Sequence, residues 1–285
     1  MDHMTATEKW LRGIALTLVV LFFMFPIFWI VLMSLQTNET ILRSPPSMIF
    51  TPTLSNYEAI IAGRLDSNVA SMGIEFMNNL KNSIILSVFA VGLSLLLGVP
   101  AAYAFARHKF RGSEDIAFTL LSFRFAPPLL VVLPLTIYFQ QLGLADTYVG
   151  LVWVYQLICL PLILWIVRGY FEDISPDVEY AHRIAGHSWL QTFLKIAIPL
   201  ARPGIAAAGL LAFIFAWNNF IFALVLASAD KQPVTVGALA FVTASGIQYG
   251  QIAAAVVLSI APTLALALYA QRYLVEGLSL GAVKG

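Results

Sequence analysis

The chain has 285 residues, of which 60% are hydrophobic and 11% are charged, and its mean hydropathy is +0.84. In soluble domains roughly a quarter of all residues are charged. This composition therefore excludes a soluble globular protein and indicates an all-α, polytopic membrane protein. The net charge of +1 gives no reason to expect a nucleic acid partner. The single Cys159 lies in an apolar run and offers neither a disulfide nor a metal cluster, so we expect a buried packing thiol.

The first apolar run covers residues 13–35. It is long enough for a bilayer-crossing helix of about 20 residues and too long for the core of a signal peptide, so we expect it to be retained. Lys9 and Arg12 precede it, which predicts a cytoplasmic N-terminus. The polar, turn-rich stretch 36–82 is typical of an external loop, with short interfacial helices near residues 57–61 and 76–80.

The second predicted span, 83–106, contains no charged residue and ends in a short basic loop. Arg107, Lys109 and Arg111 crowd this loop, which indicates that it is cytoplasmic.

The third predicted span, 116–139, contains Arg124, followed by Pro127, Pro128 and Pro134. The prolines remove backbone donors, so we expect this helix to be kinked or broken. An arginine at the centre of a span costs about 2.5–3.5 kcal/mol on insertion scales, so its side chain should face the bundle interior or water. Two roles stay open: a group that lines the pathway, or a hydrogen bond that holds the broken helix ends.

Three more spans are predicted at 147–167, 204–229 and 251–271, with a central loop at 168–203 and a tail at 272–285. Six spans place both termini on one side of the membrane. Eleven Lys and Arg residues then lie in cytoplasmic segments and four in external ones, which agrees with the positive-inside tendency.

The central loop keeps a helical rhythm of apolar residues between Pro176 and Pro203. Pro176 is placed for a helix start and Gly186 for a helix end, so the pattern predicts a short amphipathic helix, a turn, and a second helix stopped by Pro199. These features alone fit equally a helix that lies on the membrane surface.

The sequence shows no phosphate-cradling glycine loop, no metal-spaced His or Cys set and no nucleophile elbow. We therefore expect no catalytic residue, metal site or cofactor in this chain. His108, His182 and His187 fall in predicted cytoplasmic loops, where solvated side chains are expected. If the chain moves a solute uphill, the energy must come from elsewhere.

Gly186, followed by Ile196, Ile198 and Pro199, resembles the cytoplasmic-loop signature of ABC importer permeases: Glu-Ala-Ala, three residues, Gly, nine residues, Ile-x-Leu-Pro. In that family the loop forms a coupling helix that docks into a cleft of the ATPase subunit. An amphipathic helix held in a cleft can pass a rigid-body displacement into the membrane bundle.

The match departs from the signature at its start, where Tyr180-Ala181-His182 stand at the Glu-Ala-Ala positions, Glu179 comes one place earlier and Ala185 replaces the usual Asp. We expect Trp189 and Phe193 to supply buried area in the cleft, with Arg183 and Lys195 as a polar rim. The resemblance implies a coupling role for Glu179, Tyr180, Ala181, His182, Gly186, Trp189, Ile196 and Pro199.

The resemblance extends over most of the chain. NSIILS, LGVPAAYAFAR, FAWNNF and the terminal LVEGLSLGAVKG look like the maltose-transporter-type second permease subunit of carbohydrate importers. In that family the tail reaches between the two ATPase subunits, which implies a docking role for Gly277, Gly281, Lys284 and Gly285. A frayed, glycine-rich terminus is the alternative.

The implied function is that of a six-span, type I ABC importer permease in the bacterial inner membrane that imports a sugar, sugar derivative or polyol. Its implied partners are a second, non-identical permease, two ATPase subunits that carry ATP and Mg, an external solute-binding protein and membrane lipid. Polar groups within the spans are the pathway candidates: Arg124, Tyr155, Gln156, Asn218 and Asn219.

Packing alternatives remain for the pathway candidates, since paired asparagines also join membrane helices and ordinary packing suits Tyr155 and Gln156. The alternative function is a stand-alone ion-coupled carrier or a membrane scaffold. A carrier should hold acidic residues within its spans, and none of the fifteen acidic residues lies well inside one. The sequence does not identify the solute.

Overall fold

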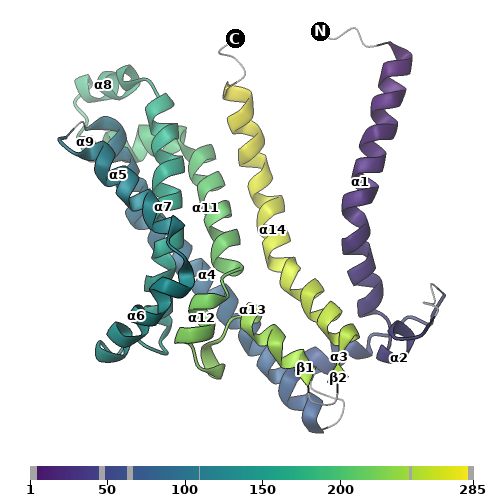
Figure 1. Ribbon diagram of the computed structural model, residues 1–285. Helices are drawn as coiled ribbons and strands as arrows, with labels where there is room; N and C mark the ends of the chain where they lie inside the picture. The colour runs from purple at the N-terminus through teal and green to yellow at the C-terminus, as the bar shows by residue number, and fades with distance from the viewer. Residues whose placement is uncertain (1–4, 45–48, 63–66, 109, 244–245, 282–285) are drawn as a thin grey trace. The chain divides into compact units, whose positions relative to one another are not determined.

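The computed structural model describes residues 5–44, 49–62, 67–108, 110–243 and 246–281, and these are almost entirely helical (Figure 1). The chain divides into two compact units. One comprises residues 1–77 and 238–260, and the other comprises residues 78–237 and 261–285.

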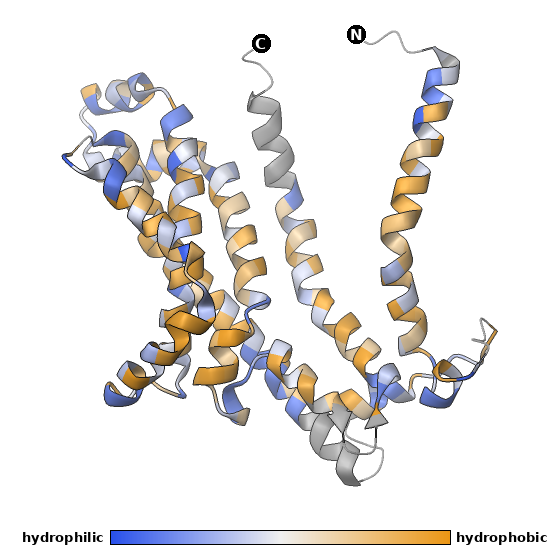
Figure 2. Ribbon diagram, viewed as in Figure 1, coloured by the Kyte–Doolittle hydropathy of each residue, from blue (hydrophilic) through white to orange (hydrophobic). Residues whose placement is uncertain are grey.

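The first unit contains the long helix α1 (Ala6–Ser34), which starts at a capping box in which Thr5 and Glu8 bond each other's backbone N–H. None of the side chains in its most apolar window is buried within the protein, and Figure 2 shows the hydrophobic residues along its length. An apolar helix with no covered face needs lipid or another chain around it.

The connections of the first unit are held by side-chain amides. Asn56, in α3 (Ser55–Ala62), donates to the carbonyls of Ser34 and Gln36 at 2.9 and 2.8 Å. Asn38, the first residue of α2 (Asn38–Ile41), donates to the carbonyl of Ile247 at 3.0 Å. The remaining elements are η4 (Ala238–Phe241), the antiparallel pair β1 (Val242–Thr243) and β2 (Gly246–Ile247), and the first parts of α4 (Ser67–Arg107) and α14 (Tyr249–Gly281).

The second unit is built on α7 (Tyr148–Asp173), which packs along α11 (Arg202–Trp217) and α4. Glycines permit these close approaches, since a Cβ at Gly204 would lie 2.2 Å from the Tyr170 ring and one at Gly98 would lie 2.9 Å from Ile163. Cys159 is fully buried and its sulfur lies 3.6 Å from the carbonyl oxygen of Ala212. The expectation of a buried packing thiol is confirmed.

The other helical segments of the second unit are short. They are α5 (Ser113–Ser122), η1 (Phe123–Phe125), α6 (Pro128–Gln141), α8 (Pro176–Ile184), α9 (Trp189–Thr192), the π-helical η2 (Phe193–Ala197), α10 (Ile198–Leu200), α12 (Ile221–Leu226), η3 (Ala229–Lys231) and α13 (Val234–Gly237).

Within the described residues, four helical segments are long and apolar enough to cross a membrane: Thr7–Ser34, Glu75–Arg107, Tyr148–Asp173 and Tyr249–Gln271. Two bent pairs raise the number to six if each pair is one span. The first pair, Ser113–Phe125 and Pro128–Gln141, bends by 97° at Pro127, which confirms the predicted break. The second, Trp189–Leu200 and Arg202–Trp217, bends by 73° at Ala201.

Pro199 does not stop the second helix of the central loop, so that expectation was wrong. Pro199 lies in α10, and the helix continues one residue past it to Leu200. The wider π-helical turn Phe193–Ala197 comes directly before it. The chain turns two residues later, at Ala201.

Three other boundaries also differ from the predictions. The expected continuous helix 204–229 is interrupted after Trp217 and resumes at Ile221, because Asn218 and Phe220 leave the regular helical path at its ends. The stretch 76–80 is not a separate interfacial helix but part of α4. The α14 helix runs on to Gly281, so most of the predicted tail continues the sixth helix.

Candidate functional site

The loop between α7 and α11 forms the helix, turn and helix that the sequence predicts. Ser175 caps α8 by accepting from the Asp177 backbone N–H at 3.3 Å. The helix ends before Gly186, which has φ +92° and donates to the carbonyl of Arg183 at 3.0 Å. A Cβ at Gly186 would meet no atom within 4 Å, so the backbone angle and not lack of space demands glycine.

Several large apolar side chains of this loop are exposed. Ile184 is 87% exposed and Leu190 is 65% exposed, although both belong to short helices outside the predicted spans. The Arg183 guanidinium lies 3.7 Å from the centre of the Trp189 ring. We call this set the docking face: Val178, Tyr180, Ile184, Trp189, Leu190 and Leu194, each exposed by 45% or more.

Glu179 points the other way, into the protein, and is 3% exposed. Its Oε2 accepts from the Tyr103 hydroxyl at 2.6 Å, and its Oε1 accepts from Nε and one terminal nitrogen of Arg107 at 2.9 and 2.8 Å. The same terminal nitrogen of Arg107 donates to the Ile174 carbonyl at 3.0 Å. The acidic residue next to the signature therefore binds α8 to the end of α4.

Phe193 also turns inward. Its ring lies 4.8 Å from that of Tyr103 and 6.4 Å from that of Phe171, and Tyr103 and Phe171 lie 5.2 Å apart. Its ring is only partly exposed, so Phe193 offers less area to a partner than the exposed Trp189. Ile196 and Pro199 are half-buried beyond it.

His182 is half-buried rather than freely solvated. Its ring stacks on His187 with centroids 3.9 Å apart, and its Nδ1 lies 3.0 Å from the Thr192 hydroxyl. Because that hydroxyl donates to the Ser188 carbonyl, the histidine Nδ1 must be the donor to Thr192. Partial desolvation, with His187 and Lys195 nearby, lowers the pKa of His182.

Arg124 lies at the break between α5 and α6, in η1. Its guanidinium carbon is 4.1 Å from the centre of the Phe215 ring. No acidic side chain in the described part of the chain forms an ion pair with it. A small cavity of about 70 Å³ beside it, lined in part by Leu157 and Phe222, has room for a few water molecules.

The other pathway candidates differ in whether their polar atoms are already bonded. Gln156 accepts from Ser94 and donates to the carbonyls of Ala90 and Val152, so it joins α7 to α4. Asn218 donates to the carbonyl of Ile214 in its own helix.

Tyr155 and Asn219 are different. The buried Tyr155 hydroxyl and the buried Asn219 Oδ1 have no hydrogen-bond partner within the described residues. Buried polar atoms are rarely left without a partner, so these two positions point to a bound group or to water. They are stronger pathway candidates than Gln156.

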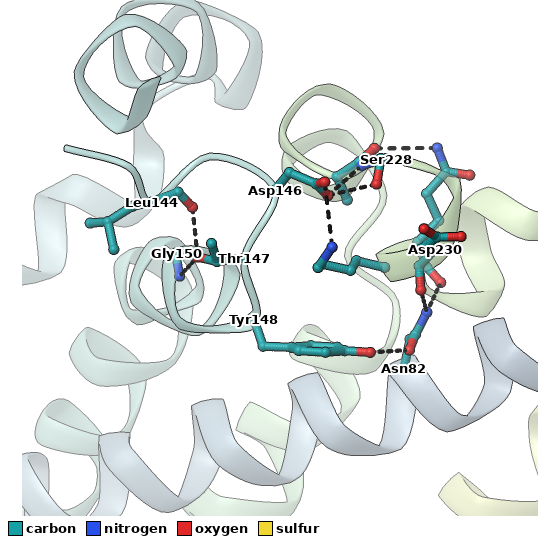
Figure 3. A network of polar contacts seen from close by, with 11 residues as sticks. Asn82, Leu144, Asp146, Thr147, Tyr148, Gly150, Ser228 and Asp230 are labelled. Carbon is teal, nitrogen blue, oxygen red and sulfur yellow. Dashed lines mark hydrogen bonds and ion pairs between the residues drawn. The ribbon is translucent and has the colours of Figure 1, made fainter. Parts of the chain in front are cut away.

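Around Asn82, well inside α4, a polar network joins two loops (Figure 3). Asp146, at φ 55°, accepts from the backbone N–H and hydroxyl of Ser228 at 2.9 and 2.8 Å and from Lys231 at 3.4 Å. Asn82 accepts from the Tyr148 hydroxyl and donates to the carbonyls of Asp230 and Gln232. Sequence analysis did not single out these residues.

The predicted docking residues of the tail are only partly described. Gly277 and Gly281 belong to α14, while Lys284 and Gly285 lie outside the described residues. Within the described residues no group of three His, Cys, Asp or Glu side chains could hold a metal ion.

Comparisons with known proteins agree with this architecture. Residues 94–279 match the model of the family described as binding-protein-dependent transport system inner membrane component. The chain is 35% identical over 274 residues to the trehalose transport system permease protein SugB of Mycobacterium tuberculosis, covering 94% of this chain and 95% of that relative. It is 33% identical over 264 residues to the trehalose/maltose transport system permease protein MalG of Thermococcus litoralis, covering 92% of each.

A solved structure shows the same fold. The chain matches, with a TM-score of 0.76 and 24% identity, the crystal structure of a bacterial ABC transporter involved in the import of the acidic polysaccharide alginate. The match covers 96% of this chain and 99% of that one.

Proposed function

Because the chain belongs to the family of binding-protein-dependent transport system inner membrane components, we propose that it carries a sugar, sugar derivative or polyol across the bacterial inner membrane. In this proposal a separate ATPase supplies the energy and binds the ATP and Mg. A second permease completes the pathway, two ATPase subunits bind the cytoplasmic side, and an external solute-binding protein delivers the solute. Relatives named for trehalose and maltose transport support the carbohydrate class.

The observation that carries the proposal is the docking face. Ile184 and Leu190 expose apolar side chains on the loop between α7 and α11, while Glu179 and Phe193 hold the other side of that loop to the protein. A loop that is held to the protein on one side and exposes apolar side chains on the other suits insertion into a hydrophobic groove of a partner. We assign that groove to the ATPase, with the α14 end and tail, including Gly277, Gly281, Lys284 and Gly285, as a second contact.

The pathway residues in this proposal are Arg124, Tyr155 and Asn219, because their polar groups lack a protein partner or face a cavity. Asn218 is a weaker candidate, and Gln156 acts in helix packing. Hydroxyl-rich solutes need such amide, phenol and guanidinium groups for orientation.

The docking proposal is tested by replacing Ile184. Burial of an isoleucine side chain is worth about 1.5–3 kcal/mol, so Ile184→Asp should weaken retention of the ATPase by roughly tenfold or more during purification through a tag on this chain. Leu142→Asp is the matched control, because Leu142 is 69% exposed at the other end of the unit and should leave retention unchanged. Equal retention in both variants would remove the docking face from the contact.

The substrate class is tested by uptake of radiolabelled trehalose, maltose and sorbitol into cells that express the whole importer. Uptake of one of these that requires this chain would support the carbohydrate or polyol class. Uptake of none of them, in cells where the complex is assembled, would contradict it.

A further inference from the structure

Glu179 lies on the same short helix as the docking face, yet its carboxylate is not available to a partner. Both oxygens are occupied by α4, through Tyr103 and Arg107, which come 76 and 72 positions earlier in the chain. We call these three residues the α8 clamp. The side chains of Arg107 and Glu179 are 9% and 3% exposed, so the ion pair is shielded from water.

A buried ion pair adds little net stability over apolar packing, because desolvation of the charges offsets their attraction. Loss of one partner is costly, however, because it leaves an uncompensated buried charge. Such a pair therefore resists separation of the two elements that it joins more than it stabilises the fold. In this protein those elements are α8 and the cytoplasmic end of α4.

The clamp also holds the parts of the loop on either side of α8. Arg107 donates to the carbonyl of Ile174, the C-cap residue that follows α7, and the Tyr103 ring packs against Phe171 of α7 and Phe193 of η2. The end of α4 thus contacts α7, α8 and η2 together. These contacts make one packed cluster out of segments that are distant in sequence.

The backbone connects the loop to α7 and α11 but not to α4. We propose that the α8 clamp makes the end of α4 move together with the loop when the loop is displaced. Glu179 is then a positioning residue for transport. This inference rests on the proposed function, because the ATPase is taken as the source of the displacement. Without the clamp, the ring contacts of Tyr103 and the contact of the His108 ring with Trp189, at 5.7 Å between centroids, would still join the end of α4 to the loop.

The test measures whether α4 follows the loop when the ATPase closes. Spin-label pairs are introduced as cysteines in a Cys159→Ser chain within the complete importer, and distances are compared without nucleotide and after trapping with ATP and vanadate. One pair, Asp177→Cys with Val149→Cys, reports α8 against the far end of α7. The other, His108→Cys with Val149→Cys, reports the end of α4, since the His108 N–H bonds to the Ala104 carbonyl.

In the otherwise unchanged chain both distances should shift on trapping, by about 1–2 Å or more. In Glu179→Gln the 177–149 shift should persist, while the 108–149 shift should fall to less than half. Glu172→Gln is the matched control, because it neutralises an exposed carboxylate that pairs with Arg168 within α7, and both shifts should remain.

A full 108–149 shift in Glu179→Gln would overturn the inference. If Glu179→Gln does not assemble, Tyr103→Phe decides: it removes one hydrogen bond and keeps the ring, so a reduced 108–149 shift supports the clamp and an unchanged one overturns it. Absence of a 177–149 shift in the unchanged chain would instead contradict the proposed ATP-driven movement of the loop. The two failures are therefore distinguishable.

Discussion

At the scale of single residues, Gly186 and Arg124 are placed where their chemistry is hard to replace. Gly186 adopts a left-handed backbone angle at the end of α8, and Arg124 places a guanidinium over an aromatic face at a helix break. The first position is sensitive to backbone strain and the second to loss of charge.

Gly186→Val should weaken the hold on the ATPase while the membrane helices still insert. A Cβ at positive φ costs roughly 1 kcal/mol or more, and here the strain falls on the turn that orients Ile184. ATPase stoichiometry and solute uptake are measured together on the purified permease pair. Gly112→Val is the matched control, because Gly112 also has positive φ (82°) and open space around its Cα but lies outside the loop. Full coupling in Gly186→Val would assign the loop to the membrane surface.

Arg124→Met should give a complex that assembles yet transports poorly, because methionine keeps much of the side-chain volume but presents no charge to the cavity. The binding-protein response of ATP hydrolysis should persist, and Arg124→Lys should retain part of the uptake. Assembly is followed by gel filtration and uptake in cells. A complex that fails to assemble would show that the arginine mainly holds the broken helix ends.

At the scale of elements, Asp146 joins the loops 142–147 and 227–233, and Asn82 of α4 bonds the second loop and Tyr148 at the start of α7 (Figure 3). Hydrogen bonds from the backbone N–H and hydroxyl of Ser228 lower the pKa of Asp146, and Lys231 adds to the effect. The stabilisation is therefore complete above the unfolded pKa of about 3.9 and is lost as the pH falls through the lower folded value.

Asp146→Asn should accordingly raise hydrogen exchange in both loops at pH 7, and the difference from the unchanged chain should shrink in strong acid. Asp230→Asn is a suitable control, since Asp230 contributes its backbone carbonyl to Asn82 and keeps that group after substitution. Equal exchange in the two variants at pH 7 would show that the carboxylate does not hold the loops together.

At the scale of the whole molecule, the basic residues predict that Ser113 and His187 face the cytoplasm and Leu142 the outside. In a Cys159→Ser chain, single cysteines at 113 and 187 should resist an impermeant thiol reagent in intact cells, while one at 142 should react. Permeabilised cells give the control, in which all three become accessible. Labelling at 113 from outside would reverse the assigned topology.

Sequence alone determined the class of the protein and the local events along the chain. Composition excludes a soluble domain, Pro176 and Gly186 mark the limits of α8, and the prolines after Arg124 predict the break. These features depend on the hydropathy of each stretch and on the backbone preferences of single residues. Both follow from the local sequence.

The tertiary structure decided which way the side chains face. Glu179 and Tyr180 are adjacent, yet one is buried against Arg107 and the other belongs to the docking face. Likewise, the carboxylate of Asp146 accepts two hydrogen bonds from Ser228, which lies 82 positions away in the chain. The rotation of a helix about its axis and the partner of a loop carboxylate depend on contacts with distant segments, and neither hydrophobic period nor capping pattern contains that information.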